Sequence, residues 1–149
     1  KRQRAKEIIA SYNEQFNTLE AFTKYCIELA REKEYAETIM GRRRKLPGIN
    51  SNNGMVKAFA ERNAVNAPIQ GSAADIIKVA MVKLFNELEK GNWKAKMIMQ
   101  VHDELVLDVP KDELESLKPI VRECMESAVE ITVPLLVDMK SGEDWLAAH

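Results

Sequence analysis

The sequence predicts an α+β fold in which several amphipathic helices accompany a small antiparallel sheet. Two observations support this: helical periodicity dominates the first 90 residues, and the clearest strand patterns come late, without regular alternation of strands and helices. The 149 residues are 46% hydrophobic and 30% charged, which is typical of a soluble globular domain with a core. We therefore expect one domain or one piece of a domain, mainly helical over 1–96 and containing a hairpin, a helix and a terminal strand over 97–149.

The first third of the chain predicts two helices. One ends near Tyr12, and the second covers 18–38, where apolar residues recur every three to four positions. Thr18 is the expected N-cap of the second helix, because its hydroxyl can accept a hydrogen bond from the first turn.

A basic stretch follows, where the helical pattern stops at Gly41. Residues 38–49 read "TIMGRRRKLPGI" and predict a short hairpin or an irregular loop, with a turn at Pro47 and Gly48. The loop near 41–48 carries a cluster of cationic side chains that suits phosphate, although such runs are also ordinary on solvated loops: Arg42, Arg43, Arg44 and Lys45.

The middle of the chain predicts helix on both sides of Pro68, with a break at the proline and the second helix ending at Gly91. Arg62, Asn66 and Gln70 are spaced by four residues. A continuous helix would put all three on one polar face, whereas a break at Pro68 would move Gln70 to the start of the next helix. Such side chains can meet phosphates or minor-groove acceptors, or simply face solvent.

The late strand patterns are "KMIMQV" and "ELVLDV", which predict an antiparallel hairpin with His102, Asp103 and Glu104 at its tip. Residues 111–129 predict a helix that Pro119 kinks or restarts, and 133–140 predict a closing strand.

The hairpin tip offers two carboxylates, which are hard oxygen ligands for a cation such as Mg²⁺. A complete site would need further ligands from elsewhere. The alternative is that these are ordinary turn residues, but the glycine or asparagine that two-residue turns favour is absent.

Charge, cysteines and hydropathy exclude several classes of protein. The net charge of −1 gives no overall attraction to nucleic acid, and Cys26 and Cys124 lack the spacing of a zinc site or a disulfide scaffold. No apolar run approaches the ~20 residues that cross a bilayer. We expect a reduced, cytoplasmic protein with no membrane partner. Because the chain lacks an initiator Met and begins within a helical pattern, we also expect it to be part of a longer protein.

Four stretches, in order along the chain, resemble the C-terminal part of the family A DNA polymerases of the bacterial type: "ETIMGRRRKLP", "ERNAVNAPIQGSAADIIKVAM", "MQVHDELVLDVP" and "GEDWLAAH". The third is similar to that family's motif C and is highly specific. The resemblance implies a partial polymerase in which 1–96 run from the fingers to the palm and 97–149 belong to the palm.

The resemblance also implies roles for individual residues. Asp103 matches the motif C aspartate that binds the catalytic Mg²⁺ ions, and Glu104 matches the neighbouring acid. His102 and Gln70 match residues at the primer end and its minor groove. DNA contacts are further implied for Arg62, Asn66 and the cluster Arg42, Arg43 and Arg44.

Two features of the family are missing from these 149 residues: a "DYSQIE"-like motif with the other metal-binding aspartate, and the fingers helix that holds the triphosphate. We therefore expect a parent enzyme that adds deoxynucleotides to primer-template DNA in bacterial replication and repair, close to the nucleoid, and a chain that is inactive alone. The alternatives are a non-catalytic nucleic-acid-binding module, a self-associating structural piece, and a hydrolase using bare carboxylates, which lacks a nucleophile arrangement beside the tip.

Overall fold

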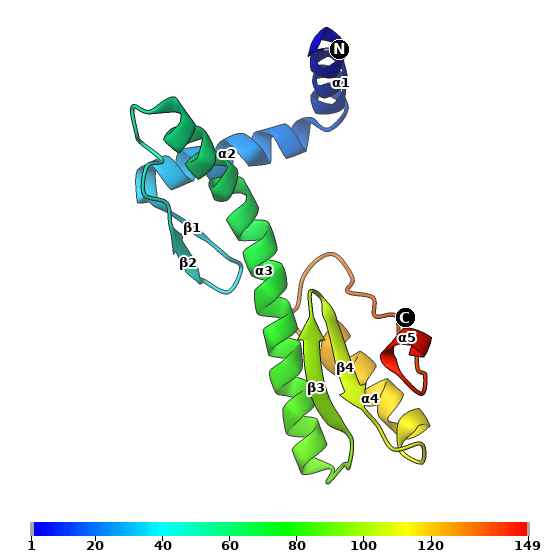
Figure 1. Cartoon of the computed structure of the whole chain (residues 1–149). Helices are drawn as coiled ribbons and strands as arrows, with labels where there is room; N and C mark the ends of the chain where they lie inside the picture. Colours follow the sequence, from blue (N-terminus) through cyan, green and yellow to red (C-terminus); the bar gives the residue numbers. More distant parts are fainter. Residues whose placement is uncertain (1, 149) are drawn as a thin grey trace. The chain divides into compact units, whose positions relative to one another are not determined.

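The computed structural model describes residues 2–148 and confirms the α+β class, with helices and two small antiparallel sheets (Figure 1). In chain order the elements are α1 (Arg2–Gln15), α2 (Asn17–Lys33), β1 (Tyr35–Glu37), β2 (Arg43–Lys45), α3 (Gly54–Lys90), β3 (Lys96–Val101), β4 (Glu104–Asp108), α4 (Leu114–Glu126) and α5 (Trp145–Ala148). The chain divides into two compact units, one up to Ser72 and one from Ala73 onward. This boundary lies inside α3.

Helices α1 and α2 form where the periodicity predicts them, but the expected cap is wrong. Helix α2 begins at Asn17, so Thr18 lies inside its first turn, and Phe16 precedes the helix without a side-chain cap. The helix also ends earlier than expected. Glu34 adopts a left-handed conformation with φ of 61°, and its N–H donates to the Ala30 carbonyl at 2.8 Å, which closes the last turn.

The first unit contains the predicted short hairpin. Strands β1 and β2 pair antiparallel, with Ala36 opposite Arg44. The unit has a core of small and branched side chains contributed by α2, the hairpin, the following turn and α3: Ala30, Ala36, Leu46, Ile49, Ala60, Ala64 and Ala67. Because five of these seven side chains are single methyl groups, the elements approach each other closely.

Helix α3 is 37 residues long and runs through Pro68, so the predicted break there is wrong. It begins after Asn53, whose Oδ1 accepts from the Met55 N–H at 3.0 Å and the Val56 N–H at 3.4 Å. An internal proline costs a helix about 3 kcal/mol. Burial of two leucines, Leu84 and Leu88, contributes about 1.5–3 kcal/mol each, and the alanines before Pro68 are buried too. Packing on both sides of the proline therefore outweighs its cost.

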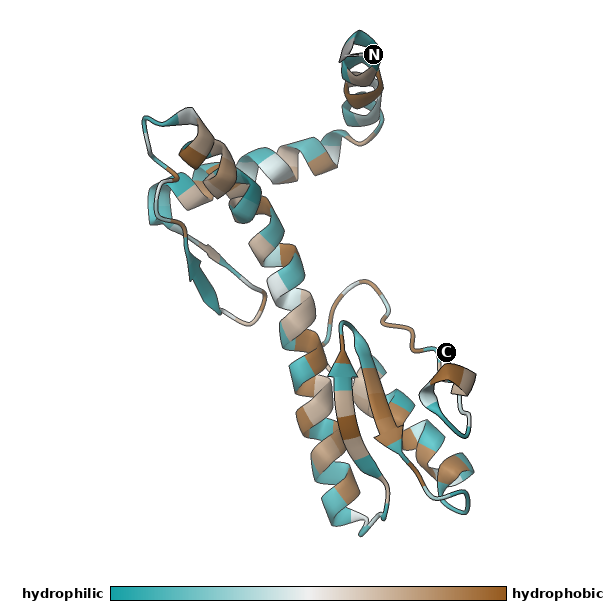
Figure 2. Ribbon diagram, viewed as in Figure 1, coloured by the Kyte–Doolittle hydropathy of each residue, from teal (hydrophilic) through white to brown (hydrophobic). Residues whose placement is uncertain are grey.

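The second unit contains the predicted late hairpin. Strands β3 and β4 pair antiparallel with a bulge between Met97 and Met99, which leaves Ile98 61% exposed. Helix α4 is continuous through Pro119, so the proline does not restart it. The buried core residues of this unit come from α3, from α4 and from the residue before β3: Leu84, Leu88, Ala95, Leu117, Val121 and Cys124. Partly buried side chains of the hairpin pack against them: Met97, Leu105 and Leu107. Figure 2 shows hydrophobic residues recurring along these elements.

The closing strand predicted over 133–140 is wrong, since this segment pairs with no strand among the residues described. Its backbone is held instead by a side chain, because the Val137 N–H donates to Glu126 Oε1 at 3.1 Å. The apolar alternation is present, but a strand forms only where a neighbour supplies its ladder bonds. Over residues 2–148, no helix has both the length and the apolar character needed to cross a membrane.

Candidate functional site

The tip of the β3–β4 hairpin is a two-residue loop. Val101 and Glu104 form the last pair of the ladder, and His102 and Asp103 make the turn between them. His102 has φ of +53°, a region where glycine is the usual residue at the first loop position of such turns. The Gln100 side-chain amide donates a hydrogen bond to the His102 carbonyl, which holds the turn from the strand side.

The tip therefore places its three candidate side chains at the surface, on a backbone held by the strand pairing and by Gln100. His102, Asp103 and Glu104 are all exposed. A strained backbone that carries a polar side chain where glycine would be easier indicates that the side chain itself is needed. The two carboxylates supply oxygen ligands of the kind a hard cation takes, so this donor set fits part of a Mg²⁺ site. Among residues 2–148 there is no cluster of three or more His, Cys, Asp or Glu that could hold a metal.

The polar face of α3 is the second candidate feature. Because α3 is continuous, the one-face arrangement of Arg62, Asn66 and Gln70 is the correct alternative. All three side chains are exposed. The Arg62 guanidinium lies 5.9 Å from the centre of the Phe59 ring, one turn earlier, in a cation–π contact.

The three arginines of the basic cluster have different surroundings. Arg42 Nη2 donates to the Gly71 carbonyl at 3.0 Å. Arg43 Nε lies 2.7 Å from Glu37 Oε2, and its guanidinium stacks 4.7 Å from the Tyr35 ring centre. The hydrogen bond to Glu37, with the nearby charges, raises the pKa of Arg43 above its ordinary value.

Arg44 is the third member of the cluster. It is exposed and makes no ion pair or ring contact with any other residue in the range 2–148. Of the three arginines, which look equivalent in the sequence, Arg42 and Arg43 are thus engaged by neighbouring groups and Arg44 is an exposed cation.

The structure gathers these candidates in two groups. His102, Asp103 and Glu104 lie together in the second unit, whereas the α3 face and the basic cluster lie in the first. Sequence reasoning missed the contact partners of Arg42 on α3, although a glycine in the interior of a long helix is a usable signal of a close approach.

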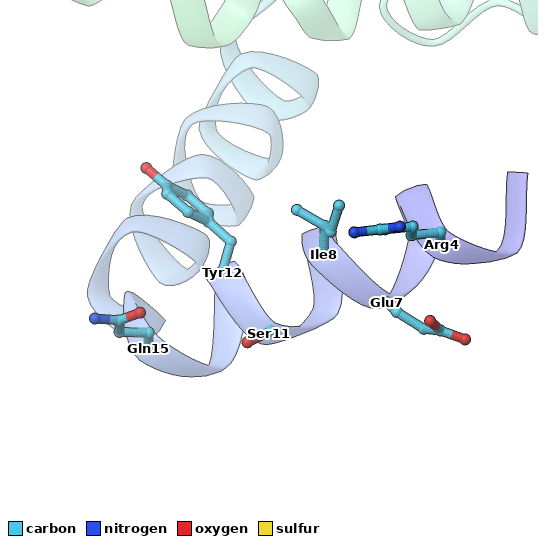
Figure 3. A pocket seen from close by; sticks show the side chains of 6 residues that line it. All are labelled: Arg4, Glu7, Ile8, Ser11, Tyr12 and Gln15. Carbon is cyan, nitrogen blue, oxygen red and sulfur yellow. The ribbon is translucent and has the colours of Figure 1, made fainter. Parts of the chain in front are cut away.

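A hollow elsewhere in the first unit carries no comparable chemistry. It lies along α1, and Figure 3 shows Ile8 and Tyr12 on one side of that helix and Glu7 on another. Its lining comes from this single helix: Arg4, Glu7, Ile8, Ser11, Tyr12 and Gln15.

Comparisons with known proteins agree with the motifs. The family model described as DNA polymerase family A matches residues 1–147. The chain is 47% identical over 147 residues to DNA polymerase I of Streptococcus pneumoniae and 44% identical over 147 residues to that of Bacillus subtilis, covering 99% of this chain in both cases.

A solved structure, the POL domain of Pol1 from M. smegmatis in complex with DNA primer-template and dNTP, matches with a TM-score of 0.95 and 40% identity over 98% of this chain. The chain spans 17% of the length of the two curated relatives and 26% of that structure.

Proposed function

Because the chain belongs to DNA polymerase family A, we propose that the protein carrying it is a DNA-directed DNA polymerase that transfers nucleotides to a primer 3′ end. The observation that carries this proposal is the hairpin turn of His102 and Asp103. The turn presents a histidine and adjacent carboxylates, and His102 adopts a positive φ that is unfavourable for a residue with a Cβ. It lies inside a sequence that matches the family along its length.

Asp103 and Glu104 are the residues proposed to hold Mg²⁺. When bound, the ions stabilise the charges of the attacking and leaving oxygens in an in-line displacement. The chain's own contribution is to keep two carboxylates at one end of a paired hairpin, with Glu104 anchored in the ladder and Asp103 in the turn. The turn backbone is further fixed by Gln100, so the carboxylates lose little freedom when they bind.

His102 and Gln70 are proposed to contact the primer end and its minor groove. Both can donate hydrogen bonds, and acceptors occupy similar minor-groove positions in every base pair, so such donors can test pair shape without reading sequence. Arg62 and Asn66 are proposed to line the DNA track. The shared exposed face of α3 supports this, because one strand can follow consecutive helical turns.

The wider assignments belong to the same proposal. The protein acts on primer-template DNA with deoxynucleoside triphosphates in bacterial replication and repair, in the cytoplasm near the nucleoid. Residues 1–96 run from fingers to palm and 97–149 belong to the palm. The chain alone is inactive, because its 149 residues contain no "DYSQIE"-like motif with a second metal-binding aspartate.

Primer extension by the full-length protein tests the proposal. Asp103→Ala should reduce the extension rate by at least about 10²-fold, because a metal ligand is lost, while DNA affinity stays near that of the unsubstituted protein. Asp108→Ala is the matched control, since Asp108 is an exposed acid at the far end of the same hairpin. An Asp103→Ala rate equal to the control would refute the metal role, and extension by the 149-residue chain alone would refute its inactivity.

A second candidate function is a nucleic-acid-binding module without catalysis. The exposed cations of β2, Arg44 and Lys45, favour it. A salt-dependent band shift of duplex DNA by the isolated chain would support binding, and no shift at low salt would reject it.

Self-association of the isolated chain is the third candidate. Large apolar side chains are exposed along α1 and α2, and such surface favours association: Ile8, Ile9, Tyr12, Phe16, Leu19, Phe22 and Tyr25. Light scattering at several concentrations measures it, and a monomer mass throughout would reject it.

A further inference from the structure

The loop between β1 and β2 docks on one turn of α3, and we call this contact the loop–helix junction. It joins residues 38–42 to residues 68–72. The Arg42 guanidinium donates to the Gly71 carbonyl at 3.0 Å, and the Ile39 N–H donates to Ser72 Oγ at 3.0 Å. Both partners on α3 come directly after Gln70 in the chain.

Gly71 allows the junction to be this close. A Cβ at this position would lie 2.6 Å from Thr38 Cγ2, nearer than two carbon atoms that are not bonded to each other normally approach. A glycine inside a helix costs about 1 kcal/mol relative to alanine. Close packing of the loop is the structural reason for a glycine here.

Ser72 connects the junction to Pro68. Its hydroxyl donates to the Pro68 carbonyl while accepting from the Ile39 N–H, and the side chain is buried. Proline has no N–H to donate to the carbonyl four residues earlier, and its ring crowds that carbonyl, so the helix loses one ladder bond in the turn that ends at Pro68. The Ser72 contacts lie in the next turn of the helix. The loop supplies hydrogen bonds from outside the helix at this turn.

The loop itself is braced before it meets α3. The Thr38 N–H donates to the Arg42 carbonyl at 3.0 Å, and the Arg42 N–H donates to Thr38 Oγ1 at 3.1 Å. Arg42 therefore belongs to a rigid loop, and its guanidinium reaches the Gly71 carbonyl as part of a fixed unit.

We propose that Arg42 is a positioning residue that holds the α3 turn carrying Gln70. This rests on the proposed function, in which Gln70 contacts the primer end. Arg42 acts through the Gly71 carbonyl, a role that differs from the phosphate contact expected from the sequence. Arg44, which is exposed on the neighbouring strand, is the member of the cluster that contacts DNA phosphate.

The first test uses the full-length polymerase and compares extension of matched and mismatched primer 3′ ends. Gln70→Ala should lower the matched-to-mismatched ratio about tenfold, the effect of one lost hydrogen bond. Arg42→Ala should lower the same ratio several-fold. The double variant should have a ratio no lower than that of Gln70→Ala, because Arg42 affects the ratio only through the Gln70 contact. Arg42→Lys, which keeps a donor for the Gly71 carbonyl, should recover much of the ratio.

The second test changes the junction without removing charge. Gly71→Ala should lower the ratio because its Cβ collides with Thr38 Cγ2. Adding Thr38→Ser should restore it, since serine lacks that methyl group but keeps the hydroxyl that accepts from Arg42. Thr38→Ser alone provides the baseline.

The third test separates positioning from phosphate contact by the salt dependence of primer-template affinity. Arg44→Ala should make the slope of log K against log salt shallower by about 0.9, the value for one phosphate. Arg42→Ala should leave the slope unchanged.

Three results would overturn the inference. The first is a change in salt slope for Arg42→Ala equal to that of Arg44→Ala. The second is a loss of the matched-to-mismatched ratio in the Arg42/Gln70 double variant that equals the product of the two single losses, and the third is a ratio for Gly71→Ala that Thr38→Ser does not restore. Failure of the proposed function looks different, because the unsubstituted full-length protein would then extend no primer.

Discussion

Replacing His102 by glycine should stabilise the β3–β4 hairpin while removing the imidazole from its tip. His102 has φ of +53°, and a left-handed conformation costs a residue with a Cβ about 1–2 kcal/mol. Glycine avoids that cost but has more freedom in the unfolded chain, which costs about 0.5–1 kcal/mol. The net expectation is a gain of about 0.5–1 kcal/mol in hairpin stability. His102→Ala also removes the imidazole but keeps the Cβ, so it should give no such gain.

Hydrogen exchange of the β3 and β4 amides in the full-length protein measures this gain, because these amides report opening of the hairpin. Glu34→Gly is the matched control. Glu34 is exposed, has φ of 61° and ends α2, so its replacement should slow exchange near that helix end without changing primer extension. Both His102 variants should lower discrimination against a mismatched primer end. Exchange that is equally slow in His102→Ala and His102→Gly would refute the strain argument.

Two further predictions concern the core of the second unit. Leu84 is fully buried, so Leu84→Ala should destabilise the unit by about 3–5 kcal/mol in a urea titration, and a loss below 1 kcal/mol would contradict the packing described. Burial, with help from Glu87 and Glu123 and against the effect of Lys83, raises the pKa of the Cys124 thiol above its ordinary 9.0. Because the folded state disfavours the thiolate, alkylation of Cys124 at pH 8 should be slower in the folded protein than in an unfolded control. The free energy of unfolding should fall as pH rises from 9.0 through the raised pKa.

Local pattern was sufficient for most elements of the fold. The periodicity of α2 and α4 and the two β-prone runs of the late hairpin each predict an element that the structure contains. The prediction failed where a partner decides the outcome. Residues 133–140 have the alternation of a strand, but no neighbouring strand within residues 2–148 accepts their ladder bonds. Thr18 is a good capping residue, but α2 begins before it.

The candidate site was predictable in the same uneven way. The residues of the hairpin tip could be named from the sequence, because His102 and Asp103 interrupt two strand patterns and form the turn. The positive φ of His102 could not be predicted from the sequence. It follows from a two-residue loop and from the pairing register of the two strands, which only the folded hairpin sets. Likewise, three consecutive arginines look equivalent in a sequence, and only their neighbours divide them into one that binds α3, one that pairs with Glu37 and one that faces solvent.

Pro68 shows why a local rule fails where a distant segment contributes. Read alone, proline predicts a helix end, and then Gln70 would lie outside the face that Arg62 and Asn66 share. The sequence offered a correcting signal three and four residues later, in Gly71 and Ser72, which make sense together only if another segment packs on that turn. Because the loop–helix junction supplies that packing, the helix continues, and its polar face continues with it. A local rule broken beside proposed site residues is thus accounted for by a non-local contact, as expected where structure serves function.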